Sequence, residues 1–128
     1  MNRSILWTDP WEGYETRTEA EIKALRYNKG KLRYDLLPWE WKEGLTQVLQ
    51  MGAEKYDDNN WRKGMSNTDI MASLERHLIE YQKGSDNDGE SNLHHMLHVA
   101  WNALAIYYFD MYNFDNDNRF IEVNKNGS

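Results

Sequence analysis

The chain contains no cysteine. A thiolate nucleophile, a disulfide framework and a thiolate zinc site are therefore excluded. It also lacks an uninterrupted run of about 18 apolar residues, the length that a membrane-spanning helix needs. Asp9, Pro10 and Glu12 interrupt the start before the apolar core of a signal peptide could form. We therefore expect a soluble protein without a membrane partner.

Positive charge is scarce, because 15 Lys and Arg residues stand against 21 Asp and Glu residues and give a formal net charge of −6. Nucleic acids and anionic membranes reward a basic surface, so we expect neither as a partner. A small anionic ligand needs only a local group of donors and is compatible with this charge. The chain has no Walker loop, GxSxG elbow or dinucleotide-binding glycine pattern, which excludes P-loop kinases and common hydrolases.

The length of 128 residues fits one domain. Residues 1–17 lack a clear period and are interpreted as an N-terminal arm. Residues 18–112 are interpreted as the helical domain. Residues 113–128 are interpreted as a polar tail with a short strand near residues 120–123. The predicted fold is all-α, a compact bundle of about four helices with an irregular arm and a polar tail. Small size and many Trp and Tyr side chains favour a homo-oligomer. The four helices are predicted over about residues 18–27, 38–56, 68–82 and 91–109, with Ser66 and Asp69 marking the start of the third. We expect Trp41 and Tyr56 on the apolar side of the second helix and Tyr81 on the inward face of the third.

The last of these segments, residues 91–109, is the longest near-continuous apolar run, yet it holds three histidines and, in the middle of the run, Asn102. On a helix, His95, His98 and Asn102 share one narrow face, with His94 beside it. Buried imidazoles and amides need partners, because each unpaired group costs on the order of 1–3 kcal/mol. These residues therefore either bond to the backbone and to neighbouring helices, or they form a metal or ligand site.

Other candidate site residues lie earlier in the chain. His77 is on the inward face of the helix over residues 68–82, with Arg76 beside it. A lone core histidine is usually satisfied by backbone, but we expect His77 to face the histidines of the last helix. Glu54 ends a stripe of Glu and Gln side chains that is either solvated or able to hold a hydrated divalent cation. Asp88 lies in an acidic loop just before the last helix and could reach a bound cation.

The loop before the third helix combines an aromatic side chain with cations. Trp61 stands beside Arg62 and Lys63, as a nucleotide pocket would need for stacking and for phosphate contacts. A loop anchored in the core by one tryptophan has the same pattern. Both interpretations are kept.

Four motifs occur in an order that resembles a known phage family: KLRYDLLP, GAEKYDDNNWRKGM, LERHLIEYQKGSDNDGES and LHHMLHVAWN. The family is the dATP/dGTP diphosphohydrolase N-terminal domain, and the resemblance covers about residues 29–109. The family pattern matches the chain at Lys55, Tyr56, Asn60, Trp61, Gly64, Arg76, His77, Asp88, His95, His98 and Asn102.

The resemblance implies an all-helical protein related to the MazG-like nucleotide pyrophosphatases, which cuts a nucleoside triphosphate, here a purine deoxynucleotide, to its monophosphate and pyrophosphate. The implied cofactor is a divalent metal, Mg²⁺ or Mn²⁺, with Zn²⁺ or Fe²⁺ as further options because imidazole ligands suit them. MazG-type enzymes carry acids where this chain carries His95 and His98. The catalytic candidates are Glu54, His77, His95 and His98, and the metal-ligand candidates are these four with Asp88. The substrate-binding candidates are Lys55, Tyr56, Asn60, Trp61, Arg62, Lys63, Arg76 and Asn102.

Two other functions fit the same residues. The first is a non-catalytic phage protein that binds and sequesters a nucleotide or a nucleotide signal. The second is a helical assembly module whose histidines are core residues. The resemblance to a phage family implies that the protein works in the cytoplasm of the infected bacterial host.

Overall fold

The structure is a computed structural model that describes residues 24, 25, 27, 29–112 and 114–122. The chain divides into two units, residues 1–34 and 35–128. The described part of the first unit contains a turn at residues 29–30 and no helix before Tyr34. The arm expected over residues 1–17 lies outside the described residues.

The described residues confirm an all-α architecture with fewer helices than predicted. Of the segment expected to form a helix over residues 18–27, only residues 24, 25 and 27 are described and none is helical, so the fourth helix is not confirmed. The described residues form no strand, and the one expected near residues 120–123 is absent from 120–122. In chain order the elements are η2 (Tyr34–Leu36), α2 (Trp39–Lys55), η3 (Asn60–Lys63), α3 (Asn67–Gln82) and α4 (His95–Met111), where η marks a 3-10 helix.

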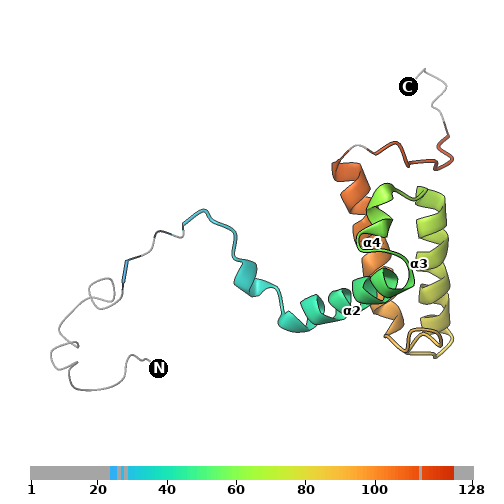
Figure 1. The fold of residues 1–128 in the computed structure, drawn as a ribbon, viewed down its shortest axis with the longest axis horizontal. Coiled ribbons are helices and arrows are strands. Elements are labelled where there is room, and N and C mark those ends of the chain that lie inside the picture. The colour runs from blue at the N-terminus through green and yellow to red at the C-terminus, as the bar shows by residue number, and fades with distance from the viewer. Residues whose placement is uncertain (1–23, 26, 28, 113, 123–128) are drawn as a thin grey trace. The chain divides into compact units, whose positions relative to one another are not determined.

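The helices α3 and α4 form an antiparallel pair, joined by a loop at the end where α4 begins (Figure 1). Their interface holds the core, in which Ile70, Ala105 and Phe109 are buried. Trp61 and Trp101 pack against this cluster. The helical spacing of these apolar side chains creates the buried stripe that holds the pair together.

Polar contacts from Ser66 and from the C-terminal tail fix the start of α3, and only the Ser66 contact was predicted from the sequence. The hydroxyl of Ser66 accepts the backbone N–H of Asp69 at 3.3 Å, which confirms the predicted helix start. The tail adds a second set of contacts, because the Asn116 carbonyl accepts the N–H of Asn67 at 3.0 Å. Asn118 Oδ1 accepts the N–H of Thr68 at 3.0 Å. The described part of the tail therefore satisfies two N–H groups that a helix start leaves free.

The helix α2 crosses the pair near the beginning of α4 (Figure 1). Gly44 and Val48 are its buried residues, and Gly44 lies directly against the side chain of Leu97 in α4. The predicted apolar side of α2 is wrong at its ends, since Trp41 and Tyr56 are each 60% exposed. The reason is that α4 contacts the middle of α2 and leaves both ends uncovered.

Two further predictions needed correction near the loop between α3 and α4. His94 precedes α4 and caps it, because its Nδ1 accepts the N–H of Met96 at 3.0 Å. It is therefore not on the helix face where it was expected. Tyr81, predicted to face inwards, is 43% exposed at the last turn of α3, where its ring lies 5.6 Å from that of His94. None of the helices in the described part of the chain has the length and apolar character that a membrane span requires.

Candidate metal centre and adjoining pocket

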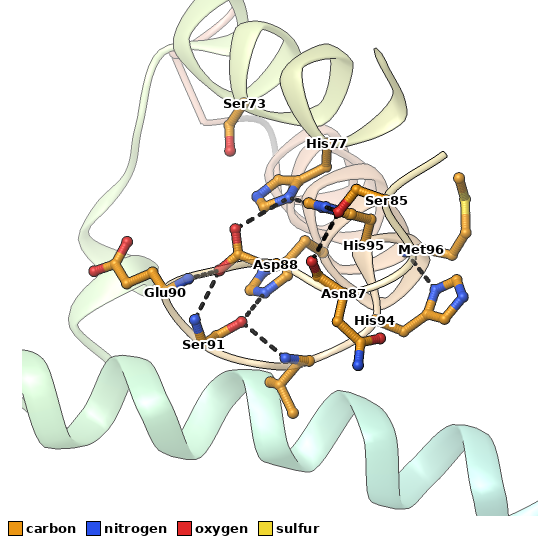
Figure 2. Close-up of polar contacts among 12 residues, drawn as sticks. Ser73, His77, Ser85, Asn87, Asp88, Glu90, Ser91, His94, His95 and Met96 are labelled. Carbon is orange, nitrogen blue, oxygen red and sulfur yellow. Dashed lines mark hydrogen bonds and ion pairs between the residues drawn. The ribbon is translucent and has the colours of Figure 1, made fainter. Parts of the chain in front are cut away.

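The loop between α3 and α4 is shaped by Asp88. One of its carboxylate oxygens, Oδ2, accepts the backbone N–H groups of Glu90 at 3.2 Å and Ser91 at 2.8 Å. Its own N–H donates to the Leu93 carbonyl, and its carbonyl accepts the N–H of Asn92, which adopts a left-handed conformation with φ 61°. These bonds fold the loop tightly and turn the second oxygen of Asp88 towards the helix pair, as Figure 2 shows.

This oxygen, Oδ1, faces the imidazoles of His77 from α3 and His95 from α4 (Figure 2). His77 Nδ1 in α3 lies 3.0 Å from His95 Nδ1 in α4 and 3.9 Å from Asp88 Oδ1. The three candidate ligand atoms all lie within 4.8 Å of one another, and within the described residues no other group of three or more acids and histidines does so. Nitrogen and oxygen ligands at about 2.1 Å from a metal are at most about 4.2 Å apart, so the residues fit a metal after a small adjustment.

Hydrogen bonds around His95 fix its proton on Nε2 and leave Nδ1 as an acceptor. The Ser85 hydroxyl donates to the Asn87 carbonyl at 3.1 Å, so its oxygen can only accept from His95 Nε2, 3.2 Å away. This assigns the His95 proton to Nε2 and places a lone pair on Nδ1. An orienting partner on the second ring nitrogen is the usual support of a metal-binding histidine.

Without an ion, His77 must be the donor in the bond between the two imidazoles. Its Nδ1–H points at the His95 lone pair. Ligation by both rings requires the His77 proton to move to Nε2, a change that costs little for a neutral imidazole. Protonation of the second His77 nitrogen would prevent this shift and leave no lone pair on the ring, so metal binding is expected to weaken in acid.

His98 supports the cluster from the opposite face of His77. The two rings stack at 4.3 Å between centroids with an interplanar angle of 8°. Ser91 Oγ accepts the N–H of Leu93 at 3.1 Å, so its hydroxyl proton can go to His98 Nε2, 2.8 Å away. His98 is then neutral with its proton on Nδ1.

The charges of the cluster suit a cation. Burial lowers the pKa of His77 and of His98, and the neighbouring imidazoles lower them further, against the raising effect of Asp88. Burial alone would raise the pKa of Asp88, but hydrogen bonds from Ser91 outweigh it and hold that pKa below its ordinary value. At neutral pH His77 and His98 are thus neutral and the Asp88 carboxylate is ionised. The neutral imidazole of His77 and the ionised carboxylate are the forms that bind metals.

A pocket of about 540 Å³ adjoins this cluster. It opens between α2, the loop after α2 and the facing sides of α3 and α4, and His98 belongs to its wall. Trp61 forms part of the wall and is held by Trp101 and Tyr108, with ring centroids 5.9 Å and 4.8 Å away. Arg62 lies 5.4 Å above the Trp61 ring. The volume and the mixture of apolar walls with a few polar groups are those of a small-molecule site.

The structure sorts the predicted site residues into three groups. His77, Asp88 and His95 form the cluster. A second group lines the pocket: Tyr56, Asn60, Trp61, Arg62, His98 and Asn102. A third group is exposed and belongs neither to the cluster nor to the pocket wall: Glu54, Lys55, Lys63 and Arg76.

Lys55 still connects to the site indirectly. Its Nζ lies 3.3 Å from Glu90 Oε2, and Asp88 accepts the backbone N–H of the same glutamate. This partner raises the pKa of Lys55. Sequence reasoning missed the two serines, Ser85 and Ser91, that orient the imidazoles. The only sequence signal was a pair of hydroxyl residues flanking an acidic loop.

Comparison with known proteins completes the description. Residues 21–119 match the family model described as dATP/dGTP diphosphohydrolase, N-terminal. A protein named dATP/dGTP diphosphohydrolase from Salmonella phage PMBT28 is 30% identical over 87 residues, which cover 68% of this chain and 30% of the relative. No solved structure matches the chain. The motif order had predicted this assignment, and the chain belongs to the dATP/dGTP diphosphohydrolase N-terminal family.

Proposed function

We propose that the protein is a metal-dependent nucleotide pyrophosphohydrolase that converts a purine deoxynucleoside triphosphate to its monophosphate and pyrophosphate. One observation carries the proposal: the His77, Asp88 and His95 cluster lies beside a pocket with an aromatic wall, and His98 joins the two. The printed name of the phage relative points to the same reaction class. Because the chain spans less than a third of that relative, its activity needs a direct test.

In this reaction water adds to the α-phosphorus, the bond from that phosphorus to the bridging oxygen breaks, and pyrophosphate leaves. His77, Asp88 and His95 would hold the metal, which when bound supplies positive charge for the phosphates and lowers the pKa of bound water. His98, neutral and at the pocket wall, would take up the proton of the attacking water at Nε2, and its hydrogen bond from the Ser91 hydroxyl would break in this step.

The remaining polar and aromatic groups of the pocket would bind the nucleotide. Arg62 is the cation of the pocket wall and would contact phosphate oxygens through its planar guanidinium. Tyr56 or Trp61 would offer a ring to the base. Two imidazoles with one carboxylate favour Mn²⁺, Fe²⁺ or Zn²⁺ over Mg²⁺, which prefers oxygen ligands.

The test is direct. The purified protein is incubated with each of the four deoxynucleoside triphosphates and with Mn²⁺ or Mg²⁺, and monophosphate and pyrophosphate are measured by chromatography. We expect equal amounts of both products from dATP or dGTP, loss of turnover in His95→Ala, and full turnover in Gln47→Ala, an exposed α2 residue outside the pocket wall. Absence of pyrophosphate with every nucleotide and metal would refute the enzyme.

A second candidate function is nucleotide binding without catalysis. It is favoured by the direct bond between His77 and His95, which satisfies both imidazoles without an ion. The same pocket would then hold a nucleotide that the protein sequesters. Calorimetric binding of dATP or dGTP, combined with no product after prolonged incubation, would select this function over the enzyme.

A further inference from the structure

Asn102 is a buried amide whose orientation is fixed. Only 5% of the residue is exposed, and its Nδ2 donates to the His98 carbonyl at 2.7 Å and approaches Ser73 Oγ at 3.5 Å. A backbone carbonyl has no proton to give, so the atom bonded to it must be the amide nitrogen. The two ends of this side chain are therefore assigned without ambiguity.

The other end of the amide is an acceptor without a partner. Among the described residues none donates a hydrogen bond to Asn102 Oδ1, and Asn102 belongs to the wall of the pocket. Because the His98 carbonyl holds the nitrogen end of the amide, Oδ1 is the end that Asn102 offers as an acceptor to a ligand in the pocket. The neighbouring wall residues Trp61, Met65 and Trp101 offer apolar surface around it.

Asn102 also lies at a suitable distance from the metal cluster. It follows His95 by seven residues on the same helix, which is about 10 Å along the axis. Within a nucleotide whose α-phosphate is at the cluster, the base is the part that reaches this far. The pocket continues from Asn102 to the aromatic wall at Trp61, on which a base ring can lie.

We propose that Asn102 orients the base of the bound nucleotide, its fixed Oδ1 accepting a hydrogen bond from an N–H donor on the edge of the base ring. This inference rests on the proposed nucleotide site and names the residue that reads the base. Adenine offers its exocyclic amine, and guanine offers its ring N–H and its amine. The pocket walls, not this single acceptor, would distinguish large bases from small ones.

The first experiment uses the unaltered protein and three nucleotides that cannot be cleaved, because a methylene group replaces the oxygen between the α- and β-phosphates. They are the analogues of dATP, of purine 2′-deoxyriboside triphosphate, which lacks every N–H donor on the base, and of 2′,3′-dideoxyATP, which lacks the sugar 3′-hydroxyl. Calorimetry in the presence of Mn²⁺ gives the three values of Kd. We expect the purine analogue to bind about 10-fold more weakly than the dATP analogue, and the dideoxy analogue to bind equally well.

The second experiment repeats the titrations with Asn102→Ala and with Gln47→Ala as the matched control. In Asn102→Ala the dATP and purine analogues should bind with the same Kd, whereas the control should keep the difference. Near-ultraviolet circular dichroism reports whether each variant is folded. If Asn102→Ala is unfolded, the first experiment, which uses the unaltered protein, decides whether Asn102 orients the base.

The outcomes separate this inference from the proposed function. Equal binding of the dATP and purine analogues by the unaltered protein refutes the role of Asn102 and leaves the nucleotide site intact. Weaker binding of the dideoxy analogue alone also refutes it, because the acceptor then reads the sugar. Failure of all three analogues to bind refutes both the inference and the proposed function.

Discussion

Two replacements of Asp88 would separate its role in the loop from its role in the metal cluster. Both backbone N–H groups that Asp88 accepts, those of Glu90 and Ser91, go to the single oxygen Oδ2. Asparagine can place its amide oxygen at the same point and keep both bonds. Its NH₂ group then replaces the oxygen that faces His77, which removes the negative charge and the third candidate metal ligand.

The magnitudes follow from these bonds. Asp88→Asn should change the free energy of unfolding by less than about 1 kcal/mol, since the loop bonds survive. Asp88→Ala loses two hydrogen bonds to a charged acceptor that is 22% exposed, for which about 2–3 kcal/mol is reasonable. In a domain of this size that loss lowers Tm by on the order of 10 °C. Metal affinity should fall in both variants by more than about 10- to 100-fold, the usual effect of changing a residue that only supports a ligand.

The assay combines thermal unfolding of chelator-treated protein with calorimetric titration of Mn²⁺ and Zn²⁺. The expected pattern is a nearly unchanged Tm for Asp88→Asn together with lost metal binding, and a lowered Tm for Asp88→Ala. The reasoning is refuted if Asp88→Asn binds metal as tightly as the unaltered protein. It is refuted equally if the asparagine variant is as unstable as the alanine variant.

Three further predictions concern stability. In metal-free protein, Tm should fall as the pH drops below about 6.5. Burial lowers the pKa of His77 and His98, so in this range the unfolded chain binds protons that the folded state excludes. A Tm that stays constant down to about pH 5.5 would contradict the neutral state of these two buried rings. Ser66→Ala removes the cap of α3 and should cost about 1 kcal/mol in urea unfolding, whereas Ser66→Asp should not. Phe109→Ala, at the centre of the core with 1% exposure, should cost about 3–5 kcal/mol in the same measurement or leave the chain unfolded.

Local chemistry explains what the sequence predicted well. The start of α3 follows from one side chain, Ser66, that satisfies a nearby N–H group, and the burial of His95, His98 and Asn102 follows from their spacing in an apolar helix. The expected meeting of His77 with a histidine of α4 is also confirmed, because both lie on inward faces of adjacent helices.

Tertiary contacts explain what it did not predict. Periodicity gives the apolar face of a helix but not how far a neighbour covers it, so Trp41 and Tyr81 were placed inside although they are exposed. The direction of the Asp88 carboxylate depends on several backbone bonds of the loop and on the left-handed Asn92. Such backbone bonds and the conformation of Asn92 leave no periodic pattern in the sequence from which they could be predicted.

The close contact between Gly44 and Leu97 has a consequence for how the protein can diverge. A Cβ at residue 44 would lie 2.5 Å from Leu97 Cδ2, so a larger residue must move the Leu97 side chain or lift α2 away from α4. The same helix supplies one wall of the pocket further along. The size of the pocket can therefore be adjusted by substitutions at a helix crossing outside the pocket wall, while the side chains that line the pocket stay unchanged.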